Sequence, residues 1–194
     1  MRCAALLVAL AASCGTTAHR PIAPRLDAAA RLVDPGSNAP FAVAERYRGR
    51  VVVLDFWASW CEQCRETVPQ VARLADAFAA QGLVIVGVNE GDRAGEATAA
   101  AETFGIAYPI ALDLDLTFSD RLGATGLPTL VVIDRDGLVV HRAKHVDAET
   151  LAVIRRLLSE KPAPTPSPPP TLPPTSPPPS PPDDASPSSA PPPP

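Results

Sequence analysis

The chain has 194 residues, a formal net charge of −4 and 25 prolines, 18 of which lie between Pro162 and Pro194. Without that end and the first 37 residues, about 120 residues remain, enough for one compact domain with a single core. The charge divides into +2 for residues 1–37, −5 for 38–160 and −1 for 161–194. No segment therefore has the basic excess that nucleic-acid binding requires.

The first residues have the layout of a secretory signal. Arg2 is followed by an apolar run from Cys3 to Ala12, about ten residues against the roughly 20 that a membrane-spanning helix needs. We expect residues 1–13 to be a signal peptide. The segment Leu10-Ala-Ala-Ser-Cys14 resembles the lipobox of bacterial lipoproteins, which implies that Cys14 is lipidated and becomes the mature N-terminus. A cleaved soluble signal, giving a soluble periplasmic or secreted protein, and an uncleaved N-terminal helix are the alternatives.

Two further segments lack the pattern of a folded core. Residues 14–35 are rich in Ala, Pro, Thr and Arg and show no helical or strand period, so we expect a tether. Residues 161–194 form a Pro/Ser/Thr run with almost no large apolar side chain, and such a run cannot bury enough surface to offset the entropy of ordering. We expect a disordered tail there and one folded domain over residues 36–160.

Residues 50–159 alternate between strand and helix patterns, which predicts an α/β fold. Residues 51–56 form a continuous apolar, β-branched run, as expected for a central strand covered on both faces, so its one charge, Asp55, is unusual. Apolar spacing, glycines and a capping Asp147 predict the rest: helices over 64–81, 95–104, 117–122 and 148–159, strands over 83–88 and 108–112, and a β-hairpin over 129–141.

The chemistry is carried by Cys61-Glu-Gln-Cys64, between the first strand and the first helix. A Cys-x-x-Cys pair is either a redox pair or half of a metal site. A zinc site of the usual kind needs two more ligands, and the domain has no further cysteine and only His141 and His145, so we expect no metal. A structural disulfide that closes so short a loop would constrain the unfolded chain only weakly. Redox work is the better interpretation.

The position of the pair suggests how it works. Cys61 lies at the start of a helix, where unpaired N–H groups and the macrodipole favour an anion, so a thiolate is favoured there. We expect Cys61 to attack a partner's disulfide and Cys64, one turn further on, to resolve the mixed disulfide. Asp55 would lie beneath the pair, with a pKa raised by burial, and could take the proton of Cys64. A strand-end aspartate that merely reaches solvent is the alternative.

The segment Asp55-Phe-Trp-Ala-Ser-Trp-Cys-Glu-Gln-Cys-Arg65, with Pro69 and Gly126-Leu-Pro-Thr129, resembles the thioredoxin superfamily. Together with Gly36-Ser-Asn-Ala-Pro40, Val88-Asn-Glu90 and Leu130-Val-Val-Ile-Asp-Arg-Asp-Gly137, it resembles the extracytoplasmic TlpA/ResA-like thiol-disulfide oxidoreductases. The resemblance implies a thioredoxin-like fold with a central mixed β-sheet flanked by helices. It also implies that a redox-active disulfide is the only cofactor, that protein thiols and disulfides are the partners, and that a membrane donor supplies electrons on the periplasmic side.

The same resemblance assigns the remaining site residues. It implies that Pro128 is a cis-proline facing the cysteine pair, a rare conformation that fits a functional role; an ordinary trans proline in a turn is the alternative. The side chains or backbone expected to contact substrate surround the pair and this proline: Trp60, Glu62, Gln63, Leu127 and Thr129.

Two positions in and near the Cys-x-x-Cys segment bear on which substrate the protein reduces and on the direction of electron transfer. Relatives that reduce apocytochrome c carry glutamate three residues after the second cysteine, where this chain has Thr67. Glu62 places a negative charge beside Cys61, which opposes the thiolate, favours a lower reduction potential and points to a reductant.

One alternative to an oxidoreductase is a membrane-anchored thioredoxin-fold binding protein without turnover. A thiol peroxidase is another, although Cys61 lacks the Pro-x-x-x-Thr-x-x-Cys context of those enzymes.

Overall fold

The computed structural model describes residues 24–26 and 31–160. The expected signal peptide, Cys14 and the proline-rich residues 161–194 lie outside the described residues. Within these residues, no helix is both long and apolar enough to cross a membrane.

The described residues form a mixed sheet of five strands in the order β3-β2-β1-β4-β5. Its central strand, β1, pairs in parallel with β2 and antiparallel with β4. β3 extends the sheet in parallel on one side, and β5 forms an antiparallel hairpin with β4 on the other. The strands are β1 (Val51–Trp57), β2 (Leu83–Glu90), β3 (Ile110–Asp113), β4 (Thr129–Ile133) and β5 (Val139–Ala143).

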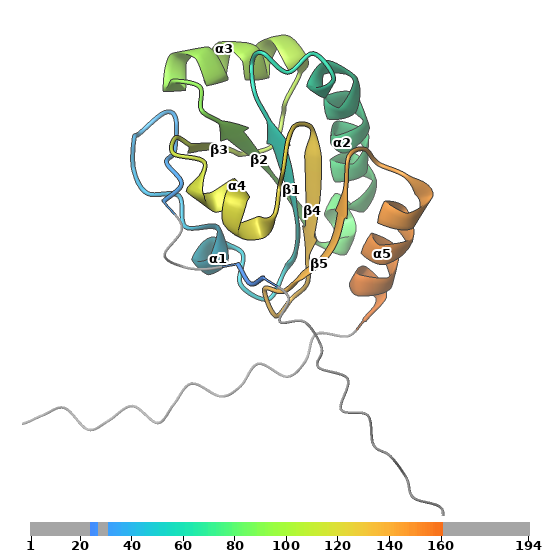
Figure 1. Cartoon of the computed structure of the whole chain (residues 1–194). Coiled ribbons are helices and arrows are strands. Elements are labelled where there is room, and N and C mark those ends of the chain that lie inside the picture. The colour runs from blue at the N-terminus through green and yellow to red at the C-terminus, as the bar shows by residue number, and fades with distance from the viewer. Residues whose placement is uncertain (1–23, 27–30, 161–194) are drawn as a thin grey trace, which may run out of the picture. The chain divides into compact units, whose positions relative to one another are not determined.

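Helices cover both faces of this sheet (Figure 1). They are α1 (Val43–Arg46), α2 (Cys64–Phe78), which continues into a 3-10 turn over Ala79–Gln81, α3 (Ala94–Phe104), α4 (Thr117–Leu122) and α5 (Ala148–Ser159). Asp147 caps α5 as expected, because its side chain accepts a hydrogen bond from the Thr150 N–H at 2.7 Å. The thioredoxin-like fold that the sequence predicts, a mixed sheet flanked by helices, is confirmed.

The period of two in β1 divides its side chains between two cores. One core packs Val52, Leu54 and Phe56 against residues of α1 and α4. The other packs Val51 and Val53 against residues of α2 and α5. Every residue of β1 is buried, so Asp55, which follows Val53 on the α2 face, lies in an interior position.

Three local features differ from the sequence prediction. The short helix α1 was not expected. β3 begins at Ile110, two residues later than expected, because Pro109 contributes a carbonyl to β2 but has no N–H to donate. The folded part begins before residue 36: Leu32 is 1% exposed, and Val33 forms bridges with Pro40 and Leu112. These apolar side chains complete the core from a segment expected to be a tether.

Candidate redox-active site

Cys61 and Cys64 form a disulfide between the end of β1 and the beginning of α2. The helix begins at Cys64, three residues after Cys61, but the Cys64 N–H donates to the Cys61 Sγ at 3.2 Å. The first N–H of the helix is therefore directed at the sulfur that would carry the negative charge. Cys61 retains 6% exposure and Cys64 none, so Cys61 is the more accessible of the two residues.

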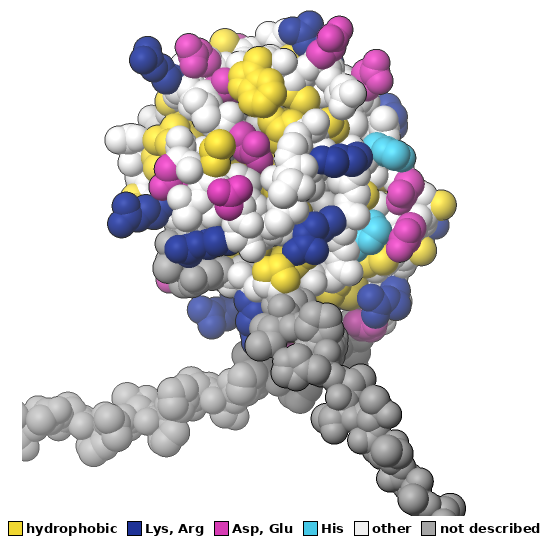
Figure 2. All heavy atoms as spheres, in the orientation of Figure 1, with side chains coloured by type: hydrophobic (Ala, Val, Ile, Leu, Met, Phe, Trp, Pro, Cys, Tyr) yellow, Lys and Arg dark blue, Asp and Glu magenta, His cyan; other side chains and the backbone are white. Residues whose placement is uncertain are grey.

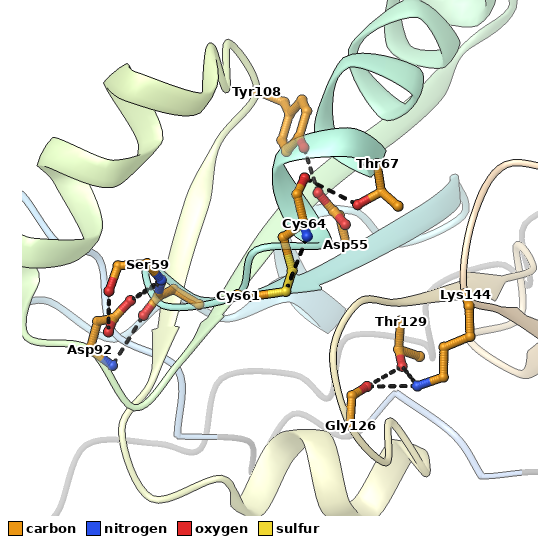
Figure 3. Close-up of a disulfide and its surroundings, with 11 residues drawn as sticks. Asp55, Ser59, Cys61, Cys64, Thr67, Asp92, Tyr108, Gly126, Thr129 and Lys144 are labelled. Carbon is orange, nitrogen blue, oxygen red and sulfur yellow. Dashed lines mark hydrogen bonds between the residues drawn. A yellow bond between two sulfur atoms is a disulfide. The ribbon is translucent and has the colours of Figure 1, made fainter.

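Asp55 is fully buried on the sheet face that α2 covers. Burial raises the pKa of its carboxyl group to about 6, and a hydrogen bond from Tyr108, O–H to Oδ2 at 2.5 Å, opposes part of that rise. Oδ1 has no hydrogen-bond partner in the described structure. Figure 3 shows the carboxyl group close to Cys64 at the start of α2. An aspartate that merely reaches solvent is therefore excluded.

A second acidic side chain, Asp92, fixes the turn that carries the cysteines. Its carboxylate accepts hydrogen bonds from the Ser59 N–H at 2.7 Å and the Ser59 hydroxyl at 2.9 Å. It also accepts from the Asn89 side-chain amide at 2.8 Å. Because Asp92 is 6% exposed and follows the end of β2, these bonds tie the turn after β1 to the neighbouring strand (Figure 3).

The loop before β4 brings the proline to the same edge of the sheet. β4 runs antiparallel to β1, with Thr129 opposite Phe56, so the residues before β4 meet the turn that follows β1. The Leu127–Pro128 bond is cis, and the Leu127 side chain packs against the cluster that contains both cysteines.

Lys144 holds this loop from the end of β5. Its ammonium group donates to the carbonyls of Thr125 at 2.9 Å and Gly126 at 2.8 Å, and to the Thr129 hydroxyl at 2.9 Å. The Thr129 hydroxyl donates in turn to the Gly126 carbonyl at 2.6 Å. Thr129 is 4% exposed, so its side chain supports the loop from within.

A groove of about 280 Å³ runs beside the proline. Its lining comes from the first turns of α2, the proline loop and the end of β5: Gln63, Glu66, Thr67, Gln70, Pro128, Lys144 and His145. Trp60 is 70% exposed, and Glu62 is exposed as well. Figure 2 shows hydrophobic side chains gathered where β1 ends and α2 begins, on a face over which acidic and basic side chains are otherwise interspersed.

A third buried acid, Glu90, lies on the opposite face of the sheet from Asp55, at the end of β2. It is 9% exposed, and its Oε1 has no partner among the described atoms. Burial raises its pKa to about 7; a hydrogen bond with Ser119 and the charge of Lys144 lower the pKa, whereas Asp113 and Asp120 raise it.

The sequence indicated the two cysteines, Asp55 and Pro128, but not the residues that hold them. The supporting hydrogen bonds of Tyr108, Asp92 and Lys144 join residues that are far apart in the sequence, and none of the three belongs to a local motif. The sequence signal nearest to them is the polar end of the apolar strand β2, at Asn89 and Glu90. Among the described residues, no group of three or more His, Cys, Asp or Glu side chains is arranged to hold a metal ion.

The architecture and the Cys-x-x-Cys pair beside a cis-proline are those of a thioredoxin-fold redox protein. A family model described as Redoxin matches residues 23–158. The chain belongs to the Redoxin family, and its relatives place it among the TlpA/ResA-like members of the thioredoxin superfamily.

Two relatives are named thiol-disulfide oxidoreductase ResA. That of Geobacillus thermodenitrificans is 36% identical over 93 residues, covering 48% of this chain and 53% of the relative. That of Bacillus subtilis is 32% identical over 118 residues, covering 56% and 66%. The matches thus span about half to two thirds of the relatives' length. A solved structure titled as a putative thiol:disulfide interchange protein DsbE from Chlorobium tepidum is 26% identical, with a TM-score of 0.58 over 70% of this chain and 94% of the other.

Removal of the Asp92 carboxylate is expected to loosen the turn that carries the cysteines. Asp92→Ala leaves the Ser59 N–H and the Asn89 amide without their acceptor, which should lower the free energy of unfolding by about 2–4 kcal/mol. Urea unfolding of the oxidised chain measures this loss. Asp76→Ala, at an exposed position on α2, is the control and should change stability by less than about 0.5 kcal/mol. Equal stability of the two variants would contradict the structural role of Asp92.

Glu90 is expected to make the folded state less stable as the pH rises. Its pKa is raised in the fold from 4.5 to about 7, so the unfolded chain releases this proton first. Stability is therefore full below about pH 4.5 and falls until about pH 7. The loss should be on the order of 2–3 kcal/mol.

Urea unfolding of the wild type and of Glu90→Gln over this pH range tests the expectation. The variant should lose less stability, although Asp55, with a pKa of about 6, leaves part of the slope in place. Glu102→Gln, at an exposed position on α3, should follow the wild type. A slope in Glu90→Gln as steep as that of the wild type would show that Glu90 ionises as easily in the fold as in the unfolded chain.

Proposed function

We propose that this protein reduces the disulfides of other proteins outside the cytoplasm. The observation that carries the proposal is the arrangement at one edge of the sheet: a Cys61–Cys64 disulfide at the start of α2, close to the buried Asp55 carboxyl group and beside the cis-proline loop. The relatives' name, thiol-disulfide oxidoreductase, supports the same chemistry.

In the reduced protein, the Cys61 thiolate attacks one sulfur of the substrate disulfide, and the other substrate sulfur leaves as a thiolate that takes up a proton. Cys64 then loses its proton to Asp55 and attacks the Cys61 Sγ. The second substrate sulfur leaves and is protonated, so the substrate gains two thiols while Cys61 and Cys64 become the disulfide. An external dithiol must reduce this pair before the next cycle.

The surroundings of the pair provide a site for an extended peptide. Trp60 offers an exposed apolar surface on one side of Cys61, and the groove beside Pro128 lies near the start of α2. The backbone on either side of the cis-proline would pair with the substrate, with Gln63 and Leu127 as neighbours. Glu66, Lys144 and His145 in the groove favour a polar peptide segment next to the substrate cysteine.

The location rests on the N-terminal sequence. The apolar run from Cys3 to Ala12 and the lipobox-like segment that ends at Cys14 support export and a lipid anchor on the periplasmic side of a bacterial membrane. In that setting the electron donor would be a membrane protein.

The direction of transfer is testable by the reduction potential of the pair. We use the full chain with Cys3→Ser and Cys14→Ser, equilibrated against glutathione and dithiothreitol buffers. We expect a potential near or below that of thioredoxin, roughly −270 mV. We also expect the protein to catalyse the reduction of insulin disulfides by dithiothreitol. A potential near DsbA's, roughly −120 mV, would instead indicate an oxidant or isomerase. A pair that exchanges with neither buffer would favour a binding protein without turnover.

The division of labour between the cysteines gives a second test. Cys64→Ser should accumulate a mixed disulfide with the substrate through Cys61, because the resolving thiol is absent, whereas Cys61→Ser should accumulate none. Non-reducing electrophoresis after incubation of the reduced variants with disulfide-bonded insulin detects the adduct. Adducts of equal yield in both variants would contradict the assignment of Cys61 as the attacking cysteine.

A further inference from the structure

Tyr108 is the only described residue with a hydrogen bond to the Asp55 carboxyl group, and it comes from a different part of the sheet. It lies two residues before β3, whereas β2 separates β3 from the central strand β1. Its hydroxyl nevertheless donates to the Asp55 Oδ2 at 2.5 Å. In Figure 3 the ring approaches the carboxyl group from beyond the start of α2.

The intervening strand has a gap at the point where the tyrosine crosses it. Gly87 of β2 is the register partner of Asp55, so a side chain there would lie on the same face of the sheet. A Cβ atom at Gly87 would stand 3.2 Å from the Tyr108 Cε2, 3.1 Å from the Ile110 Cγ2 and 3.0 Å from the Trp57 Nε1. The absence of a side chain at Gly87 is thus what lets Tyr108 pack over β2 and reach Asp55.

We propose that Tyr108 is a positioning residue, whose hydroxyl keeps Asp55 ionised with Oδ1 turned to the resolving cysteine. The inference rests on the proposed function, because it concerns the step in which Cys64 loses its proton. A hydroxyl donor favours the charged form of the carboxylate it bonds. It also occupies Oδ2, so Oδ1, which has no described partner, is the oxygen that can take the proton.

Among the described residues, no other charge offsets the burial of Asp55. The titratable groups beside it in Figure 3 are Tyr108 and, at the start of α2, the two cysteines. On the flanking strands its register partners are Gly87 of β2 and Leu130 of β4. The pKa of Asp55 is set by burial, which raises it, and by the Tyr108 hydrogen bond, which lowers it. The hydrogen bond from Tyr108 therefore controls what fraction of Asp55 is ionised, and so able to accept a proton, near neutral pH.

The step itself is a proton transfer followed by disulfide exchange. Cys64 gives its proton to the Asp55 Oδ1 and attacks the Cys61 Sγ of the mixed disulfide, and the partner's sulfur leaves as a thiolate. Tyr108 keeps its own proton throughout, since burial and the neighbouring carboxylate raise its pKa far above the usual range.

Stopped-flow reaction with DTNB separates the two sulfur steps. In the full chain with Cys3→Ser and Cys14→Ser, reduced Cys61 releases a first thionitrobenzoate, and attack by Cys64 releases the second. In Tyr108→Phe the pKa of Asp55 should rise by about one unit, which moves the acid limb of the second phase to higher pH by the same amount. The second phase should slow about fivefold near pH 6 and change less than about twofold near pH 8, with the first phase unchanged.

Three further variants exclude a merely structural effect. Tyr47→Phe removes the only other tyrosine hydroxyl of the chain, on the opposite face of the sheet, and should leave both phases unchanged. Gly87→Ala should shift the second phase in the same direction as Tyr108→Phe. In an Asp55→Asn background, Tyr108→Phe should have no additional effect.

Any of three outcomes would overturn this inference and leave the proposed function in place. They are a second phase that is unchanged in Tyr108→Phe, a second phase that slows equally at every pH, and a further slowing by Tyr108→Phe in the Asp55→Asn background. A wild type that releases no second thionitrobenzoate would contradict the proposed function, and the inference with it.

Discussion

β1 is hydrogen-bonded along both edges and covered on both faces, so a carboxylate on it has no contact with water. Burial of such a charge is costly unless the group is hydrogen-bonded or neutral. At Asp55 the fold provides one hydrogen bond and leaves one oxygen without a partner. The result is a base with a pKa of about 6, close to the pH at which proton transfer from a thiol is useful. The site is arranged around this one carboxyl group, with Gly87, Tyr108 and the first turn of α2 beside it.

The mixed topology explains why the other parts of the site converge. Because β1 and β2 are parallel, the turn after β1 and the residues after β2 meet at one edge, where Asp92 ties them together. Because β4 is antiparallel to β1, the loop before β4 reaches the same edge and presents Pro128. An all-parallel sheet would place that loop at the far end. The antiparallel hairpin of β4 and β5 also brings Lys144 to the loop it holds.

The sequence predicted what is encoded locally. The apolar runs and helical periods identified the strands and helices, with most limits in agreement and the others different by one to two residues, and the spacing of Cys61 and Cys64 identified the redox pair. Tyr108 and Asp92 were missed because their partners are 53 and 33 residues away and no periodic pattern links them. Gly87 was also missed, since a glycine within a strand shows that space exists but not which side chain fills it. The bulge between Val132 and Ile133 depends on the hairpin register, which the apolar pattern leaves open.

Two buried carboxyl groups with raised pKa values occupy this end of the sheet, and the alternation of side chains separates their roles. Asp55 points to the face of α2 and the sulfurs, whereas Glu90, after Val86 and Val88, points to the face of α4, where it meets Ser119. Both groups lower the stability of the fold when they ionise, so the pH dependence of unfolding reflects both of them. The resolving step needs a base close to Cys64, and only Asp55 lies on that face. The pH dependence of disulfide exchange should therefore follow Asp55 and its bond to Tyr108, and a difference between the two pH profiles would separate the contributions of the two acids.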